Sequence, residues 1–154
     1  MLASPNECAR QLLEAIPMVM RAIRKEMRNY RGFDLSVPKF RVLIFLNRHE
    51  GASLSEIAEH MGLALPSMSK LIDGLVARNM VLRQMDPGDR RRVTLAPTAL
   101  GRTAMQSALE ATAARLAERL ASLPSSGRRT ILEAMQILES AFGCGRTAKT
   151  ALEK

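Results

Sequence analysis

The sequence is poor in aromatic residues: it has four Phe, one Tyr and no Trp among 154 residues. RNA and other single-stranded nucleic acids are commonly bound by stacking bases on exposed aromatic rings. The scarcity of rings therefore argues against that mode of recognition. Duplex DNA is read by helices and arginines, which need no such rings.

Cysteine and histidine are equally scarce. Cys8 and Cys144 lie near opposite ends of the sequence and form no CxxC pair, and the only histidines are His49 and His60. These counts exclude a disulfide framework, a zinc ribbon and a His-rich metal site. We therefore expect no metal and no cofactor.

Long apolar runs are also absent. No run approaches the ~18–20 residues of a membrane span, and the first residues lack the basic-then-apolar layout of a signal peptide. No Gly-rich phosphate loop, Ser/His/Asp set or suitably placed carboxylate pair is found either. We expect a cytoplasmic protein that is not an enzyme and does not bind membranes.

Basic residues outnumber acidic ones, with 23 Lys+Arg against 15 Asp+Glu and a formal net charge of +8. This excess indicates an anionic partner. Hydrophobic residues make up 47% and charged residues 25% of the chain, which predicts a single globular unit with a real core.

Helical patterns occupy most of the chain. Ser4 and Glu7 form a capping box before an amphipathic stretch that Pro17 should kink or split and that Gly32 should end. Its basic stripe, Arg21 to Arg31, is either a solvated face or an auxiliary phosphate contact. Further helices are expected from Ser36, from Ser53, from about Pro66, and after residues 98 and 127. Ser53 and Glu56 form a second capping box at the start of one of them.

Two of these helices are short and joined by a tight turn containing Gly62, which predicts a helix-turn-helix. The period then changes to that of strands, over residues 81–85 and 92–96. Asp86-Pro87-Gly88-Asp89 between them is a strong turn signal. A hairpin directly after a helix-turn-helix is a wing, so the predicted fold is mainly α with a small β-wing.

The second helix of a helix-turn-helix enters the major groove, and its first residues meet the base edges. Hydroxyls at a helix start can instead be caps, and Met68 could contact a thymine methyl group or belong to the core. The candidate base-contacting residues are Pro66, Ser67, Met68, Ser69 and Lys70.

Three consecutive arginines follow the wing turn. An arginine on a hairpin tip can enter a narrow minor groove, or it can pair with Asp86 or Asp89 and hold the turn. We expect Arg90 or Arg91 to face DNA and Arg92 to face a phosphate or solvent.

The start of the preceding helix carries Ser53 and Ser55. Its free backbone amides make it a natural phosphate site.

Residues 53–101 resemble the winged helix-turn-helix of the MarR (multiple antibiotic resistance regulator) family. The stretch Leu54-Ser55-Glu56-Ile57-Ala58, then Met61-Gly62-Leu63, then 67–75 runs like the two helices of the family. Asp89-Arg90-Arg91, with Thr98 and Gly101 at the family spacing, matches its wing signature. Helix order extends the resemblance over nearly the whole chain.

The resemblance implies a homodimeric transcriptional regulator, most often a repressor, on a pseudo-palindromic operator in double-stranded DNA. Residues 4–32 and 98–142 would be dimerisation helices, 36–97 the winged helix-turn-helix, and 146–154 a frayed tail. A small-molecule effector would bind between the dimer helices and the winged domain. Asp73 would pair with a wing arginine and set the pose of the wing.

Two positions depart from the family pattern. Gly74 replaces a commonly basic residue, which removes a potential phosphate contact. Pro97 replaces an apolar strand residue, so we expect the second wing strand to end one residue early.

The effector itself is not identified by the sequence. Met27, Tyr30, Phe33 and Phe40 lie where the family pocket should be, although each could be plain core. A Met-rich pocket favours a flexible, small apolar or amphipathic ligand.

Two other functions compete with a ligand-responsive repressor. Oxidation of Cys8 and Cys144 across an interlocked dimer could be the trigger of a redox sensor. A winged helix that binds protein is the other alternative, which the arginine-rich wing disfavours.

Overall fold

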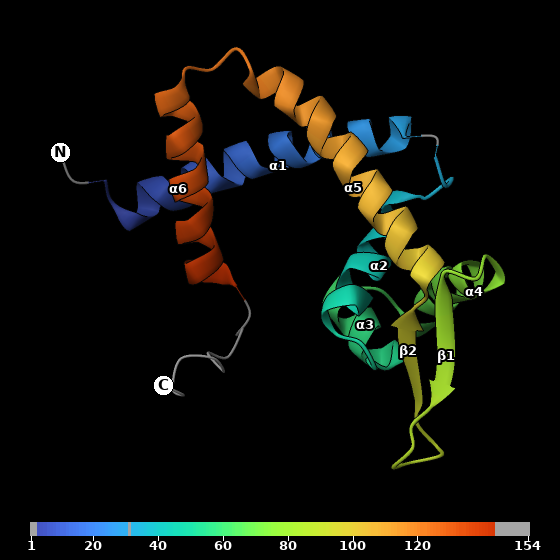
Figure 1. Cartoon of the computed structure of the whole chain (residues 1–154). Coiled ribbons are helices and arrows are strands. Elements are labelled where there is room, and N and C mark those ends of the chain that lie inside the picture. The colour runs from blue at the N-terminus through green and yellow to red at the C-terminus, as the bar shows by residue number, and fades with distance from the viewer. Residues whose placement is uncertain (1–2, 31, 144–154) are drawn as a thin grey trace, which may run out of the picture. The chain divides into compact units, whose positions relative to one another are not determined.

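The computed structural model describes residues 3–30 and 32–143 of the chain. These residues belong to two compact units, 1–116 and 117–154, and each is considered by itself. The elements, labelled in Figure 1, are α1 (Pro5–Asn29), α2 (Val37–Arg48), α3 (Leu54–Met61), α4 (Leu65–Ala77), β1 (Val81–Met85), β2 (Val93–Pro97), α5 (Ala99–Leu120) and α6 (Ser125–Phe142). The predicted class, mainly helical with a two-stranded wing, is confirmed.

Helix α1 begins as its sequence predicts. The Ser4 hydroxyl accepts a hydrogen bond from the Glu7 amide, and the Glu7 carboxylate accepts one from the Ser4 amide. The expectation that Pro17 could split the helix is wrong, because α1 is one continuous helix through that residue. The helix ends at Asn29, with Tyr30 in extended conformation as its C-cap, before the predicted end at Gly32.

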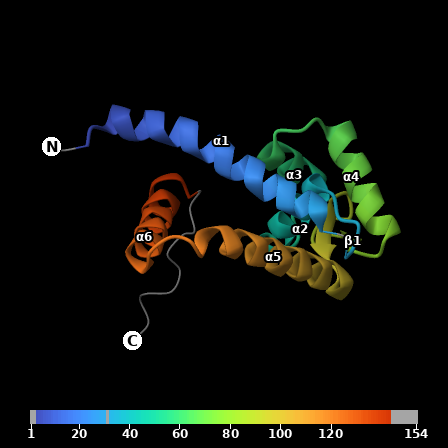
Figure 2. The ribbon, with the colours of Figure 1, turned by 90° about the horizontal axis from the view of Figure 1, so that it is seen from above.

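The core of the first unit is built around α2. Leu43 and Leu46 of α2, Ile57 of α3, and Ile72 and Leu75 of α4 are all completely buried. Helix α1 contacts α2, and its C-terminal half lies over that region in Figure 2. Removing these large apolar side chains from water is the main term that holds the helices of this unit together.

Helices α3 and α4 form the predicted helix-turn-helix. The Ser53–Glu56 capping box opens α3, and Gly62 ends it in left-handed conformation at φ 65°. Helix α4 starts three residues later, at Leu65, with Pro66 in its first turn.

The wing is an antiparallel hairpin whose register pairs Val81 with Pro97 and Met85 with Val93. Its turn points away from the helices of the first unit (Figure 1). The second strand therefore spans 93–97 and not the predicted 92–96, and Pro97 lies inside it. Proline is tolerated at this strand end because the next residue, Thr98, donates the closing hydrogen bond to the Met80 carbonyl, at 3.0 Å.

The start of α5 explains why Thr98 and Gly101 occur together. The Thr98 hydroxyl accepts a hydrogen bond from the Gly101 amide at 2.9 Å, which caps the helix. A Cβ atom at position 101 would lie 2.1 Å from the Met80 carbonyl oxygen. Only glycine allows this close approach of α5 to the wing.

The second unit contains the last turn of α5 and all of α6. None of the α6 residues is buried, and Leu132, Ile137 and Phe142 are at least 65% exposed. In the part of the chain that the structure describes, no helix is long and apolar enough to cross a membrane.

Candidate DNA-binding site

The recognition helix α4 presents a narrow polar surface. Pro66, Ser67 and Lys70 are exposed and Ser69 is half-buried. The helix has no side-chain cap, because its N-cap is Ala64, so Ser67 is not held as a cap. The proposed contact of Met68 with a thymine methyl group is not possible in this structure, since Met68 is completely buried in the core.

The tip of the wing carries two free cations. Arg90 and Arg91 are exposed, and neither forms an ion pair with any residue that the structure describes. The turn is held instead by Asp86, which accepts from the Gly88 amide at 2.8 Å, and by Asp89, which accepts from the Arg91 amide at 2.9 Å. Both carboxylates thus shape the backbone of the turn without neutralising its arginines.

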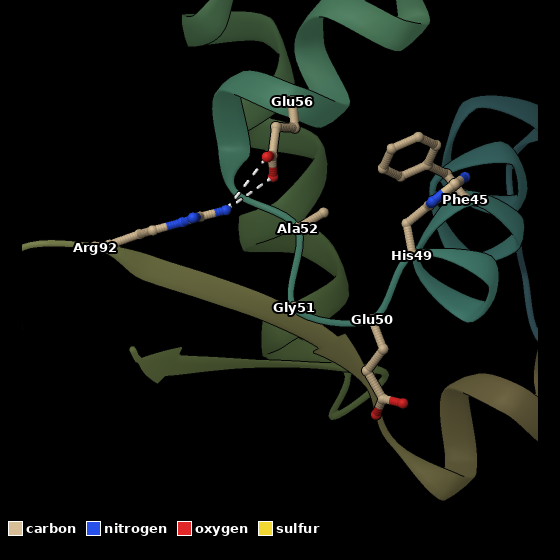
Figure 3. Close-up of a pocket in the computed structure, with 7 residues that line it drawn as sticks. All are labelled: Phe45, His49, Glu50, Gly51, Ala52, Glu56 and Arg92. Carbon is tan, nitrogen blue, oxygen red and sulfur yellow. Dashed lines mark hydrogen bonds and ion pairs between the residues drawn. The ribbon is translucent and has the colours of Figure 1, made fainter. Parts of the chain in front are cut away.

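The third arginine of the run behaves differently. Arg92 was expected to face a phosphate or solvent, but its guanidinium donates to both carboxylate oxygens of Glu56, at 3.2 and 3.3 Å. Figure 3 shows it reaching from the residue just before β2 toward α3, across a hollow of about 430 Å³ that Phe45 and His49 also line. The ion pair with Glu56 holds Arg92 toward α3.

Glu56 also changes the expected phosphate site at the start of α3. Its carboxylate accepts a hydrogen bond from the Ser53 amide at 2.6 Å, and the Ser53 hydroxyl accepts one from the Glu56 amide at 3.2 Å. The hydrogen bond from Ser53, with a smaller contribution from Arg92, lowers the pKa of Glu56 and keeps it charged. An anion at this helix end would therefore meet a carboxylate, while the exposed Ser55 is left as a hydroxyl donor.

A second ion pair attaches the wing to α4. Asp73 accepts a hydrogen bond from Arg83 of β1, so the pairing with a wing arginine that the resemblance implies is present. The sequence analysis did not single out Arg83. Arg83 lies at the centre of the strand that follows α4, only 10 residues after Asp73. This short separation is the signal that could have identified it.

Arg78, at the end of α4, is another functional candidate that was missed. It donates to the Asp34 carbonyl at 2.8 Å, to the Asp34 carboxylate at 2.8 Å and to the Phe33 carbonyl at 3.3 Å. Asp34 has a φ of 47°, a conformation that is uncommon outside glycine. The loop between α1 and α2 is thereby fastened to the recognition helix.

The candidate effector residues are only partly brought together. A cavity of about 380 Å³ is lined by Met27 and Tyr30 together with Arg28, Asp34, Leu35, Ser36 and Val37. Phe33 and Phe40 do not line it: Phe40 is buried in the core, and Phe33 packs against the core.

The predictions about the two cysteines, the tail and the basic stripe of α1 fall partly on residues that the structure does not describe. Cys8 is exposed, but Cys144 and the tail at 146–154 lie outside the described residues. In the basic stripe of α1, Arg21, Arg24, Lys25 and Arg28 are exposed, and Arg31 is outside the described residues.

Comparison with known proteins identifies this arrangement. The model of the MarR family matches residues 33–92. The HTH-type transcriptional regulator YfiV of Bacillus subtilis (strain 168), itself uncharacterised, is 28% identical over 117 residues, covering 76% of this chain and 73% of that protein.

Solved structures share the fold. RV1404 from Mycobacterium tuberculosis superimposes with a TM-score of 0.76 at 20% identity, over 96% of this chain and 99% of that one. The transcriptional repressor CouR, solved on a 23-mer DNA duplex, has a TM-score of 0.66 at 25% identity, over 91% and 99% of the two chains. CouR from Rhodococcus jostii RHA1 has also been solved with p-coumaroyl-CoA, with a TM-score of 0.61 at 24% identity, over 96% and 100%.

The helix-turn-helix and the wing agree with these matches. Residues 33–92 match the MarR family of winged helix-turn-helix transcriptional regulators, and over most of its length the chain is similar to a transcriptional regulator and to a repressor solved on duplex DNA.

Proposed function

We propose that the protein is a homodimeric repressor that binds a pseudo-palindromic operator and is released from it by a small-molecule effector. The observation that supports this DNA-binding surface is a difference among three consecutive arginines. Arg92 forms an ion pair with Glu56, whereas Arg90 and Arg91 at the tip form none with any described residue. In the proposed complex α4 lies in the major groove, with Ser67 and Lys70 toward the bases, and the two tip arginines enter the adjacent minor groove.

A second copy of the chain is the proposed partner of the outer helices. The first two thirds of α1 expose Leu13 at 76%, Met18 at 56% and Val19 at 52%. Helix α6, in the other unit, exposes Leu132 and Ile137. Apolar surface of this extent needs a cover, and a two-fold dimer of the outer helices supplies one.

The effector site we propose is the cavity beside Met27 and Tyr30. Asp34 lines that cavity and is also held by Arg78 at the end of α4. A ligand that moves this loop would change the position of the recognition helix. Ligand binding would thereby be coupled directly to release of the DNA. The cavity combines apolar side chains with the Arg28 guanidinium and the Tyr30 hydroxyl, so it fits an amphipathic ligand.

Footprinting on the DNA upstream of the gene, combined with sedimentation of the free protein, tests the proposal. We expect a dimer that protects two inverted half-sites about one helical turn (~10 bp) apart. Protection of a single half-site by a monomer would contradict it.

The effector site has its own test. Thermal-shift screening should find an amphipathic ligand that raises the melting temperature and weakens binding to the protected duplex. Met27→Ala should reduce the affinity for that ligand, and Met85→Ala, at a 67% exposed position that does not line the cavity, serves as the matched control. A screen in which only charged, wholly polar ligands bind would contradict an amphipathic effector.

A further inference from the structure

Gly74 leaves a position without a side chain on the recognition helix α4. The gap is filled from another element. A Cβ atom at Gly74 would lie 3.3 Å from Cε and 3.4 Å from Nζ of Lys39, which belongs to the first turn of α2. The Lys39 ammonium group therefore lies against the backbone of α4, where a side chain at position 74 would begin.

The position of Gly74 on α4 shows which flank this is. With 3.6 residues per turn, Ser67, Lys70 and Gly74 follow one another along a single stripe of the helix. Asp73 is turned by about 100° from Gly74 and holds Arg83 of the wing. Lys39 thus lies on one flank of the exposed face of α4, and the wing lies on the other.

The ammonium group of Lys39 has no carboxylate partner among the described residues. No ion pair joins it to a described residue, and its side chain is half-buried, so the aliphatic stem packs while the ammonium stays at the surface. By contrast, Arg78, Arg83, Arg92 and Arg102 each have a carboxylate partner. A cation that is held in place without an anion is a ready contact for a phosphate.

We propose that Lys39 is a DNA-phosphate contact, which α2 supplies in place of the missing side chain at Gly74. The proposal rests on the placement of α4 in the major groove. That groove is about 12 Å wide and is bounded by a phosphate backbone on each side. The wing approaches one backbone, and Lys39 approaches the other, so the recognition helix is fastened on both flanks.

Lys39→Gln tests this inference on both a random-sequence duplex and the footprinted duplex. A phosphate contact carries no base information, so both affinities should fall by the same factor, about 3- to 10-fold at low salt, and the slope of log K against log salt should decrease by about one. Arg41→Gln is the matched control: it removes the same charge from an exposed position about 200° around α2, and it should leave the slope unchanged.

A charge transplant separates the role of the charge from any damage to the fold. The double variant Lys39→Gln/Gly74→Lys restores a lysine at this flank, now from α4 itself. A new Cβ at position 74 meets only the flexible end of residue 39, which can move aside. Affinity and salt slope should return toward those of the wild type.

The outcomes distinguish this inference from the proposed placement of α4, for which Lys70→Gln is the reference. If Lys70→Gln weakens binding and Lys39→Gln does not, the role of Lys39 is overturned and the placement stands. If neither variant changes binding, the placement fails and the role of Lys39 fails with it. A double variant that melts like the wild type but binds no better than Lys39→Gln would also overturn the inference.

Discussion

The base and the tip of the wing differ in how their charged side chains are used. At the base, which we define as the two strands with Arg92, every arginine has a carboxylate partner: Arg83 pairs with Asp73 and Arg92 with Glu56. At the tip, residues 86–91, the carboxylates bond only to backbone amides, and Arg90 and Arg91 remain without an ion pair to any described residue. The base is built to hold the hairpin against α3 and α4, whereas the tip is built to present charge.

Three identical residues in a row therefore have two roles. What separates Arg91 from Arg92 is not residue type but the facing carboxylate, Glu56, which lies 36 positions earlier in the sequence. A contact between distant segments thus decides which arginine is paired. The comparison can be tested by changing either region and asking whether stability or binding responds.

The largest effect is expected where α5 packs against the start of the wing, from Gly101→Ala. The added Cβ would lie 2.1 Å from the Met80 carbonyl oxygen, so α5 and the wing must move apart. We expect a loss of about 2–3 kcal/mol in the free energy of unfolding, measured by urea denaturation. Gly127→Ala is the control, because its new Cβ meets nothing closer than 3.8 Å; a similar loss there would mean that the contact with Met80 is not the cause.

The next effect is expected at the tip. Replacing both Arg90 and Arg91 by Ala should leave the unfolding free energy within about 0.5 kcal/mol, because neither side chain is buried. Affinity for duplex DNA should fall by about 10-fold or more, with a decrease in salt slope of up to about two. Fluorescence anisotropy over a salt series measures both quantities, and an unchanged slope would show that the tip does not meet phosphate.

A smaller effect is expected when the ion pair between Glu56 and Arg92, at the base of the wing, is broken. Glu56→Gln keeps an acceptor for the Ser53 amide but removes the charge that holds Arg92. We expect a slightly steeper salt slope, because Arg92 becomes available to DNA as its neighbours are, and no loss of affinity. Weaker binding in this variant would mean instead that the pair acts by fixing the pose of the wing.

The smallest effect is the pH dependence of the same pair. The pKa of Glu56 is lower in the folded protein than in the unfolded chain, so its stabilising contribution is complete above the usual glutamate range and is lost as pH falls through the folded value. Since the side chain is 52% exposed, we expect less than about 1 kcal/mol. The difference in unfolding free energy between wild type and Glu56→Gln should shrink below pH 4.5, and a difference that grows there would contradict the assignment.

Local signals predicted much of this molecule. Capping boxes located the starts of α1 and α3, and the Pro-Gly turn located the hairpin, because these motifs act within three or four residues. The effect of Pro97 was misjudged because a neighbouring hydrogen bond, from the Thr98 amide to the Met80 carbonyl, closes the strand end without a donor from the proline. The burial of Met68 follows from its angle on α4, which faces the core.

The parts of the candidate site that the sequence did not predict depend on contacts between distant segments. Arg78 with Asp34 and Arg92 with Glu56 join residues 44 and 36 positions apart, which no local pattern encodes. The sequence also does not indicate that the Lys39 side chain packs against Gly74, because these residues belong to different helices.

The loop before α3 has a consequence for how the protein opens. The edge of β2 that faces away from β1 is bonded as well: the Leu95 amide donates a hydrogen bond to the Ala52 carbonyl at 2.9 Å, and the Leu95 carbonyl accepts one from the Gly51 amide at 3.0 Å. Leu95 is 2% exposed, so its amide is shielded from solvent exchange by a bond that crosses from the hairpin to the helix-turn-helix. Its hydrogen should exchange as slowly as those at the centre of α2, because releasing it requires both segments to unfold as one cooperative unit.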